Sequence, residues 1–190
     1  MSRSCEKIRL ATADDAERIH AIYAPYVRDT VISFELDVPG VEEIRKRITA
    51  TLPAHPWLVL ERDGRIAGYA YASTHRERRA YQWAADVSCY VAPEFQRQGI
   101  GRALYTALLR ILRAQGFCNA YAGIALPNAA SVGLHESAGF RAVGVYRGVG
   151  FKLGRWHDVG WWGCALGELP ATPRPPAPLD ELGLGILDEL

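Results

Sequence analysis

The chain has 190 residues, which is within the range of a single domain with one continuous core. Lysine and arginine total 22 against 21 acidic residues, so the net charge of +1 gives no reason to expect nucleic acid or an anionic membrane as a partner. No apolar run is long enough to span a bilayer, and 49% hydrophobic with 23% charged residues is typical of a soluble protein.

The N-terminus and the cysteines bear on cellular location. Residues 1–7 lack the apolar core of a signal peptide. Cys5, Cys89, Cys118 and Cys164 are far apart, and no cluster has the spacing of a metal site, so we expect no metal. Scattered single cysteines are typical of small buried hydrophobes in a reducing compartment, which favours a cytoplasmic protein.

The first part of the chain predicts a short strand and two helices. The strand covers residues 8–10, and Thr12 then begins a helix, with Asp15 three residues on completing something close to a capping box. Residues 41–50 predict the second helix. The apolar residues of the first helix recur at helical spacing: Ile19, Ile22, Tyr23, Tyr26 and Val27.

The middle of the chain changes to the pattern of strands. Residues 57–60, 66–72 and 83–91 predict three strands. Asp63 and Gly64 are a hairpin turn signal between the first two. We therefore expect an antiparallel meander.

The second half predicts alternating helices and strands. A polar loop over residues 92–101 leads into a strongly apolar helix, which Gly116 ends. Residues 120–125 predict a buried strand, and Asn128 caps a further helix that ends near Gly139. The last two strands are expected over residues 140–149 and 159–166.

The composition shifts at residue 170. Five prolines crowd the segment that follows, so we expect it to form no regular hydrogen-bonded structure and to lie extended on the surface or be disordered. We therefore place a single domain over residues 1–169 and a proline-rich tail over residues 170–190.

The most informative segment is Gln-Arg-Gln-Gly-Ile-Gly-Arg at residues 96–102, between a strand and a helix. Gly99 and Gly101 allow the backbone to approach a ligand, and the free N–H groups of a helix start favour negative charge. Arg97 and Arg102 add cations, so the segment has the features of a pyrophosphate cradle. It lacks the Gly-Lys-Ser/Thr of a Walker A loop, and the preceding antiparallel meander argues against a dinucleotide-binding fold.

The pattern Gln-x-x-Gly-x-Gly after a strand resembles the acetyl-CoA loop of the GNAT superfamily of N-acetyltransferases. Residues 128–140, with Asn first and Gly-Phe last, resemble the helix that closes over coenzyme A in that family. Four segments are similar to phosphinothricin and methionine sulfoximine acetyltransferases: residues 30–34, 81–83, 90–93 and 150–159. The resemblance covers about residues 8–166 and implies an α/β (α+β) fold with a mixed, mostly antiparallel central sheet flanked by helices.

The resemblance implies an enzyme that moves the acetyl group of acetyl-CoA to the amino group of a small, amino-acid-like acceptor. The implied acceptors are of the phosphinothricin or methionine sulfoximine type, with a role in resistance to such compounds, and the implied assembly is a homodimer. Two alternatives stay open: the same chemistry on a polyamine, an aminoglycoside or a protein N-terminus, and a non-catalytic acyl-CoA-binding sensor. The near-neutral charge mildly opposes strongly cationic acceptors.

The resemblance also implies a cofactor site. The backbone of one strand would bond the pantetheine arm and polarise the thioester carbonyl, and the glycine-containing loop would take the pyrophosphate. Asn128 would bond the pantetheine or acetyl end. The residues implied are Cys89, Tyr90, Val91, Arg97, Gln98, Gly99, Ile100, Gly101, Arg102 and Asn128.

Asp86 and His135 are the catalytic candidates that the resemblance implies. Asp86 holds the position of the base, where the related enzymes usually have the longer Glu, so it acts through water or is a purely structural carboxylate. His135 stands where the superfamily usually has Tyr. Its imidazole can protonate the departing thiolate or simply hydrogen-bond a neighbour.

A loop with three arginines precedes the strand of Asp86. We expect Arg76 and Arg78 to clamp an acidic group of the acceptor, and the alternative is a solvated loop. Further candidates for the acceptor pocket are Phe34, Tyr81, Trp83 and Ser88, although the aromatic residues equally suit packing or a dimer interface. His157 has no assigned role, and we expect three other histidines to be incidental: His20, His55 and His75.

Overall fold

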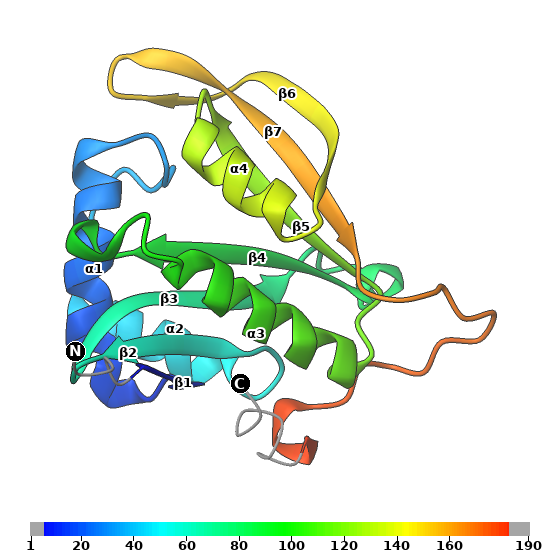
Figure 1. Ribbon diagram of the computed structural model, residues 1–190. Helices are drawn as coiled ribbons and strands as arrows, with labels where there is room; N and C mark the ends of the chain where they lie inside the picture. Colours follow the sequence, from blue (N-terminus) through cyan, green and yellow to red (C-terminus); the bar gives the residue numbers. More distant parts are fainter. Residues whose placement is uncertain (1–5, 183–190) are drawn as a thin grey trace.

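The computed structural model describes residues 6–182, and these form one seven-stranded sheet with helices on both faces (Figure 1). The strand order is β1-β2-β3-β4-β5-β7-β6, and every neighbouring pair is antiparallel except β4 and β5. The mixed, mostly antiparallel sheet is therefore confirmed. The strands are β1 Glu6–Leu10, β2 Trp57–Arg62, β3 Arg65–Thr74, β4 Ala84–Val91, β5 Asn119–Leu126, β6 Arg141–Lys152 and β7 Arg155–Ala165.

Helices cover the two faces of the first half of the sheet. α3 (Ile100–Gln115) crosses one face of β2, β3 and β4, whereas α1 (Ala16–Asp29) and α2 (Val41–Thr51) cover the other (Figure 1). Leu58 and Leu60 of β2 pack toward α3, and Val59 packs toward α1 and α2, as the two-residue period of a strand requires. The shorter α4 (Ala129–Ser137) lies near β5 and β7.

The start of α1 confirms the predicted capping box. The Thr12 N–H donates to the Asp15 carboxylate at 2.7 Å, and a single 3-10 turn over Ala13–Asp15 precedes the α-helix. Arg9 of β1 donates to both oxygens of Asp15, at 2.7 and 2.8 Å. Burial opposes ionisation of Asp15, but the hydrogen bonds from Arg9 and Thr12 outweigh it and hold its pKa below the usual value.

Strands β6 and β7 extend further toward their connecting turn than the sequence predicts. Both strands continue to a tight turn at Leu153 and Gly154, whose φ angles are 49° and 78°. Two successive left-handed residues match the twist of an antiparallel hairpin. Leucine is not a turn signal, so the sequence pattern ended β6 too early and began β7 too late.

The proline-rich segment packs against the body of the protein. The Ala177 N–H donates to the Gln115 carbonyl at 2.7 Å, Leu179 is buried, and Leu179–Glu181 forms a 3-10 turn. The expectation of no regular hydrogen-bonded structure is therefore wrong at this turn. Prolines lack N–H groups, but the carbonyls and apolar side chains of such a segment still find partners. Residues 183–190 of the predicted tail lie outside the described residues.

Cys118 and Cys164 are buried, as predicted for small hydrophobes, and Cys89 is half-buried. Cys5 lies outside the described residues. Over residues 6–182, no helix is long and apolar enough to cross a membrane. In the same range, no group of three or more His, Cys, Asp or Glu residues is placed to hold a metal ion.

Candidate active site

The site forms where β4 and β5 separate. Residues 84–86 of β4 pair in parallel with residues 119–121 of β5, and beyond that point the two strands are no longer paired. A small cavity of about 50 Å³ opens between them. It is lined by residues of both strands, of α3 and of α4: Ile32, Val87, Ser88, Cys89, Tyr90, Tyr105, Ala122, Gly123, Ile124, Ala125, Asn128, Ser131 and His135.

The separation leaves backbone groups of β4 available in this cavity. The Ala92 N–H donates to the Ala67 carbonyl across the β3–β4 ladder, so the alternating pattern turns the backbone groups of Cys89 and Val91 away from β3. The Val91 carbonyl accepts from the Tyr26 hydroxyl at 2.6 Å. The N–H groups of Cys89 and Val91 therefore face the side from which β5 has separated.

The predicted anion cradle lies at the start of α3. Gly99 has a φ of 86° and Arg97 one of 59°, both left-handed, and the Ala103 N–H donates to the Gly99 carbonyl. The N–H groups before Ala103 therefore have no helical partner and point outward from the helix end. Arg97 and Arg102 are exposed beside them.

Three other cradle residues serve as supports. Ile100 is buried in the core, so only its backbone can contribute to a site. A Cβ at Gly101 would lie 3.0 Å from Leu134, so the missing side chain lets α4 approach α3 closely. Gln98 accepts from Arg62 and donates to the Glu94 carbonyl, which fixes the loop.

Asp86 lies on β4 at the last residue paired with β5. Its carboxylate is 2.7 Å from Nδ1 of His75, which follows directly after β3. Burial raises the pKa of Asp86, and the contact with His75 and the charge of Arg76 oppose that rise. His75 is therefore not incidental in position, because it is the direct partner of the predicted base.

His135 is buried on α4, and both of its ring nitrogens are engaged. Nδ1 is 2.7 Å from the Ser131 carbonyl and Nε2 is 2.8 Å from the Tyr105 hydroxyl. A carbonyl can only accept, so Nδ1 carries the proton and Tyr105 donates to Nε2. Burial lowers the pKa of His135, so the ring is neutral near pH 7.

Asn128 and Ser88 line the same cavity. The Asn128 side-chain oxygen accepts from the Ser131 N–H at 3.1 Å, which confirms it as the cap of α4 and leaves its amide N–H groups for a ligand. A hydrogen bond with Ser88 moderates the burial-raised pKa of Tyr71.

Tyr81 and Trp83 share a second cavity, of about 310 Å³, with His75 and Tyr121. The fourth predicted wall residue, Phe34, lies elsewhere. A Cβ at Gly150 would be 2.1 Å from the Phe34 ring, so Phe34 packs directly on the β6–β7 hairpin.

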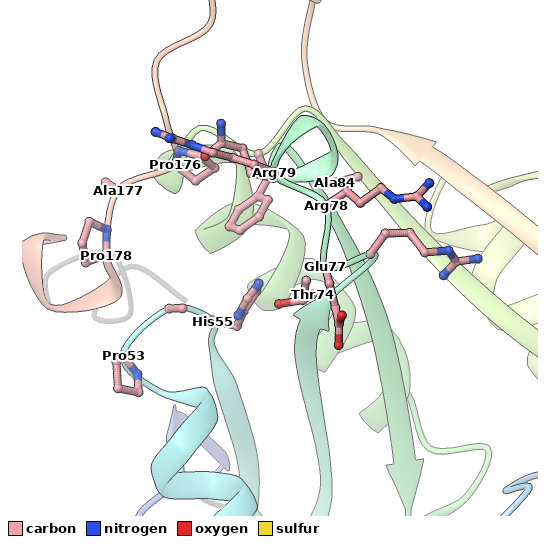
Figure 2. A pocket seen from close by; sticks show the side chains of 14 residues that line it. Pro53, His55, Thr74, Glu77, Arg78, Arg79, Ala84, Pro176, Ala177 and Pro178 are labelled. Atoms are coloured by element: carbon pink, nitrogen blue, oxygen red, sulfur yellow. The ribbon is translucent and has the colours of Figure 1, made fainter.

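The two predicted arginines lie differently. Arg76 stands 5.6 Å from the ring centre of Trp161 and acts electrostatically on Asp86. Arg78 lines a separate cavity of about 380 Å³ (Figure 2). Figure 2 shows its side chain running away from His55 and Pro178, which lie on the opposite side of that cavity. Arg76 also lines this cavity, and of the two arginines it is the one that acts on the Asp86–His75 pair.

The comparison with known proteins agrees with this geometry. Residues 8–161 match the model of the acetyltransferase (GNAT) domain. The chain belongs to the GNAT acetyltransferase family.

Similar proteins narrow the comparison. This GNAT acetyltransferase is 40% identical over 176 residues to the phosphinothricin N-acetyltransferase of Streptomyces viridochromogenes, covering 93% of this chain and 96% of that protein. It is 34% identical over 168 residues to the L-methionine sulfoximine/L-methionine sulfone acetyltransferase of Pseudomonas aeruginosa, covering 87% and 98%. The crystal structure of a GNAT phosphinothricin acetyltransferase from Sinorhizobium meliloti in complex with AcCoA aligns with a TM-score of 0.84 at 35% identity, covering 89% and 93%.

Sequence reasoning missed two residues of this acetyltransferase's site. Ser73 lies opposite Asp86 across the β3–β4 ladder, so His75, two residues on, shares the face of Asp86. The predicted antiparallel pairing of these two strands could have indicated this contact, but the first strand was predicted to end at residue 72 and so did not reach His75. Tyr105 was missed because it lies among the apolar residues of α3 and could not be told apart from them by its spacing. His157, which had no assigned role, is buried with Nε2 3.0 Å from the Lys152 carbonyl, inside the hairpin.

Proposed function

We propose that this protein transfers the acetyl group of acetyl-CoA to the amino group of a small amino acid of the phosphinothricin or methionine sulfoximine type. The observation that carries the proposal is the separation of β4 and β5, which exposes backbone donors next to the half-buried carboxylate of Asp86. The names of the similar proteins support the acceptor class.

The residues present fit acetyl-CoA. The free N–H groups at the start of α3, with Arg97 and Arg102 beside them, suit a pyrophosphate. The backbone of Cys89 and Val91 suits the amide-bearing pantetheine arm, and one of these N–H groups can hold the thioester oxygen. Acetyl-CoA would supply the acetyl group as an activated thioester.

The acceptor side is built from Arg76 and the aromatic residues around His75. An exposed guanidinium beside a ring can pair with the carboxylate of an amino acid. Tyr81 and Trp83 wall the adjoining cavity. The role of Arg78 as a second clamp remains a prediction, and Arg78 lines the cavity of Figure 2 together with Arg76.

Two protons have to be moved, one from the acceptor ammonium and one to the departing sulfur. Asp86 is placed to receive the first, directly or through a neighbour. For the second, His135 is neutral and its own proton is bound by the Ser131 carbonyl. The other proton of this pair is on the Tyr105 hydroxyl, which reaches the sulfur only by leaving its hydrogen bond to Nε2 of His135, so His135 is the positioning residue.

We further propose a homodimer formed through the β6–β7 hairpin. β6 is an edge strand, and almost its whole length is exposed on both faces. A monomer rarely exposes an apolar edge of this kind. A second copy of the chain is the occupant we propose for the apolar residues Val143, Val145, Tyr146, Val149, Phe151, Leu153 and Trp156.

We also propose the cytoplasm as the location. The support is that the described cysteines, Cys89, Cys118 and Cys164, are all free thiols, as is usual in a reducing compartment. We propose residues 1–169 as the acetyltransferase domain and residues 170–190 as a proline-rich tail, of which residues 174–182 lie across the surface of the domain. Acetylation would confer resistance to toxic acceptors of this type.

The acceptor class is tested by following thiol release from acetyl-CoA with phosphinothricin, methionine sulfoximine, a polyamine, an aminoglycoside and a short peptide. Amine-dependent release selective for the first two supports the proposal. Release only with a cationic or peptide acceptor would refute the acceptor class and keep the reaction. Acetyl-CoA binding without release across the panel would favour a sensor.

A further inference from the structure

We propose that His75, held by Asp86, is the group that takes the proton from the acceptor ammonium. This inference deepens the proposed function and rests on it. It assigns the role of base to a ring on the adjoining strand, and it makes Asp86 the positioning residue of a two-residue device.

The length of the side chains supports this arrangement. Asp86 is half-buried on the sheet, and its short side chain ends 2.7 Å from Nδ1 of His75. The imidazole extends the reach of the carboxylate by the width of a ring. Carboxylate and imidazole paired in this way are a recurrent base, because the carboxylate fixes the tautomer and stabilises the imidazolium that forms.

The orientation of the ring leaves one nitrogen for a ligand. Nδ1 faces Asp86, and Nε2 has no hydrogen-bond partner among residues 6–182. His75 keeps 15% of its side chain exposed and lines the cavity of about 310 Å³ that Tyr81 and Trp83 also line. Nε2 is therefore the atom of the pair that is free to meet a molecule in that cavity.

The Asp86–His75 pair adjoins both the cavity of about 310 Å³ and the small cavity between β4 and β5. His75 lines the larger cavity, and the two residues after Asp86, Val87 and Ser88, line the smaller one between β4 and β5. An acceptor that enters from the side of His75 thus meets the base just before the separation of the strands. This is the order that proton removal followed by acetyl transfer requires.

The charged and titratable neighbours also suit the role. Tyr121 of β5 stacks on the His75 ring at 4.8 Å, and Tyr81 lies edge-on at 6.1 Å. Trp161 of β7 contacts the ring edge-on, with the Arg76 guanidinium over its indole. Asp86 is the carboxylate that contacts the ring, so it is the group that compensates a proton gained at Nε2.

The step balances without another reactant. Nε2 takes one proton from the acceptor ammonium and becomes imidazolium beside the Asp86 carboxylate. The neutral nitrogen bonds to the acetyl carbonyl carbon, the carbon–sulfur bond breaks, and the second nitrogen proton leaves as the sulfur gains one to become a thiol. His75 then returns its proton to water.

The test uses His75→Gln and His75→Ala in the full chain, with His55→Ala as the matched control because His55 lines the separate cavity of Figure 2. We expect kcat to fall about 100-fold or more in both variants, with the KM for acetyl-CoA unchanged. We expect imidazole added to His75→Ala to restore part of kcat. The thermal melts of all variants show whether they fold.

The pH profile separates a base from a structural residue. An imidazole base works only when neutral, so we expect kcat of the wild type to rise with pH and then to level. We expect that limb to disappear in His75→Gln. A folded His75→Gln that keeps kcat within threefold and keeps the limb overturns the inference, whereas a wild type that acetylates no amine overturns the proposed function instead.

Discussion

At the scale of single residues, the site depends on which charges are left free to meet a ligand. Arg9 and Arg47 have raised pKa values because they are bound to carboxylates within the fold. Among residues 6–182, Arg76 is bound to no such carboxylate. Its Nη1 donates to the His75 carbonyl, and its guanidinium lies over Trp161. A cation held near the base but not neutralised is suited to an anionic acceptor.

We predict that Arg76→Gln raises the KM for phosphinothricin roughly tenfold, because a charge-assisted hydrogen bond to the acceptor is lost. The change in kcat should be small. Arg79→Gln is the matched control, since both arginines are on the same loop and line the cavity of Figure 2, but of the two it is Arg76 that lies over Trp161 and acts on Asp86. Steady-state kinetics with both variants provide the test, and equal effects on KM would contradict a specific role of Arg76.

The role of a residue was predictable from the sequence where the residue and its immediate neighbours form a recognisable local pattern. The glycines at the start of α3 and Asn128 as a cap could be found from local sequence, whereas Asp86 was found through the resemblance to related enzymes. Partners could not, because the contact of His75 with Asp86 depends on the register of β3 against β4. The engagement of both nitrogens of His135 likewise depends on how closely α4 packs on α3.

At the scale of elements, the proline-rich segment closes one end of the fold. Gln115, the last residue of α3, donates to the carbonyls of Ala54 and Ala177, both at 2.9 Å, and Trp83 donates to the Arg174 carbonyl at 2.7 Å. The segment thus joins the end of α3, the residues before β2 and the start of β4. Leu179 inserts its side chain into the core.

We predict that Leu179→Ala lowers the free energy of unfolding by roughly 2–3 kcal/mol, as for other buried leucines. Leu169→Ala should change it by no more than about 0.5 kcal/mol, because Leu169 is 74% exposed. Urea unfolding followed by circular dichroism measures both. Equal stability of the two variants would show that the segment adds nothing to the fold.

Element boundaries were predictable to the extent that turns have a residue signature. Asp63-Gly64 and the capping box at Thr12 were found because their chemistry is local. The turn at Leu153 was missed because its left-handed φ is imposed by the pairing of β6 with β7. The 3-10 turn after the prolines depends on burial of Leu179, which is a tertiary property.

At the scale of the whole molecule, the β6–β7 hairpin contacts the rest of the fold on one side and exposes apolar side chains on the other. Lys152 of the hairpin is buried and donates to the carbonyls of Val27, near the end of α1, and of Ser33, in the segment that follows. The outer surface of the hairpin is apolar and exposed, including Phe151 at 55% and Trp156 at 66%. One side of the hairpin therefore packs against the fold, and its exposed apolar side is the surface that we propose for the dimer interface.

We predict a dimer for the wild type and a monomer for the double variant Val149→Asp and Phe151→Asp, because two carboxylates would have to be buried at the interface. Leu169→Asp is the control, since Leu169 is an apolar residue outside the hairpin and is exposed even more than Val149 and Phe151. Sedimentation velocity distinguishes the outcomes. A wild type that is monomeric at micromolar concentration would remove the proposed interface.

We propose that the separation of β4 and β5 serves acetyl transfer to an amino acid. The most direct measurement incubates the wild type with acetyl-CoA and phosphinothricin and determines free thiol and N-acetylated product, by mass, in the same sample. We predict one N-acetyl product for each thiol, and thiol release that depends on the amine. Thiol release that is equal with and without the amine, or no N-acetyl product with phosphinothricin or methionine sulfoximine, would contradict the claim.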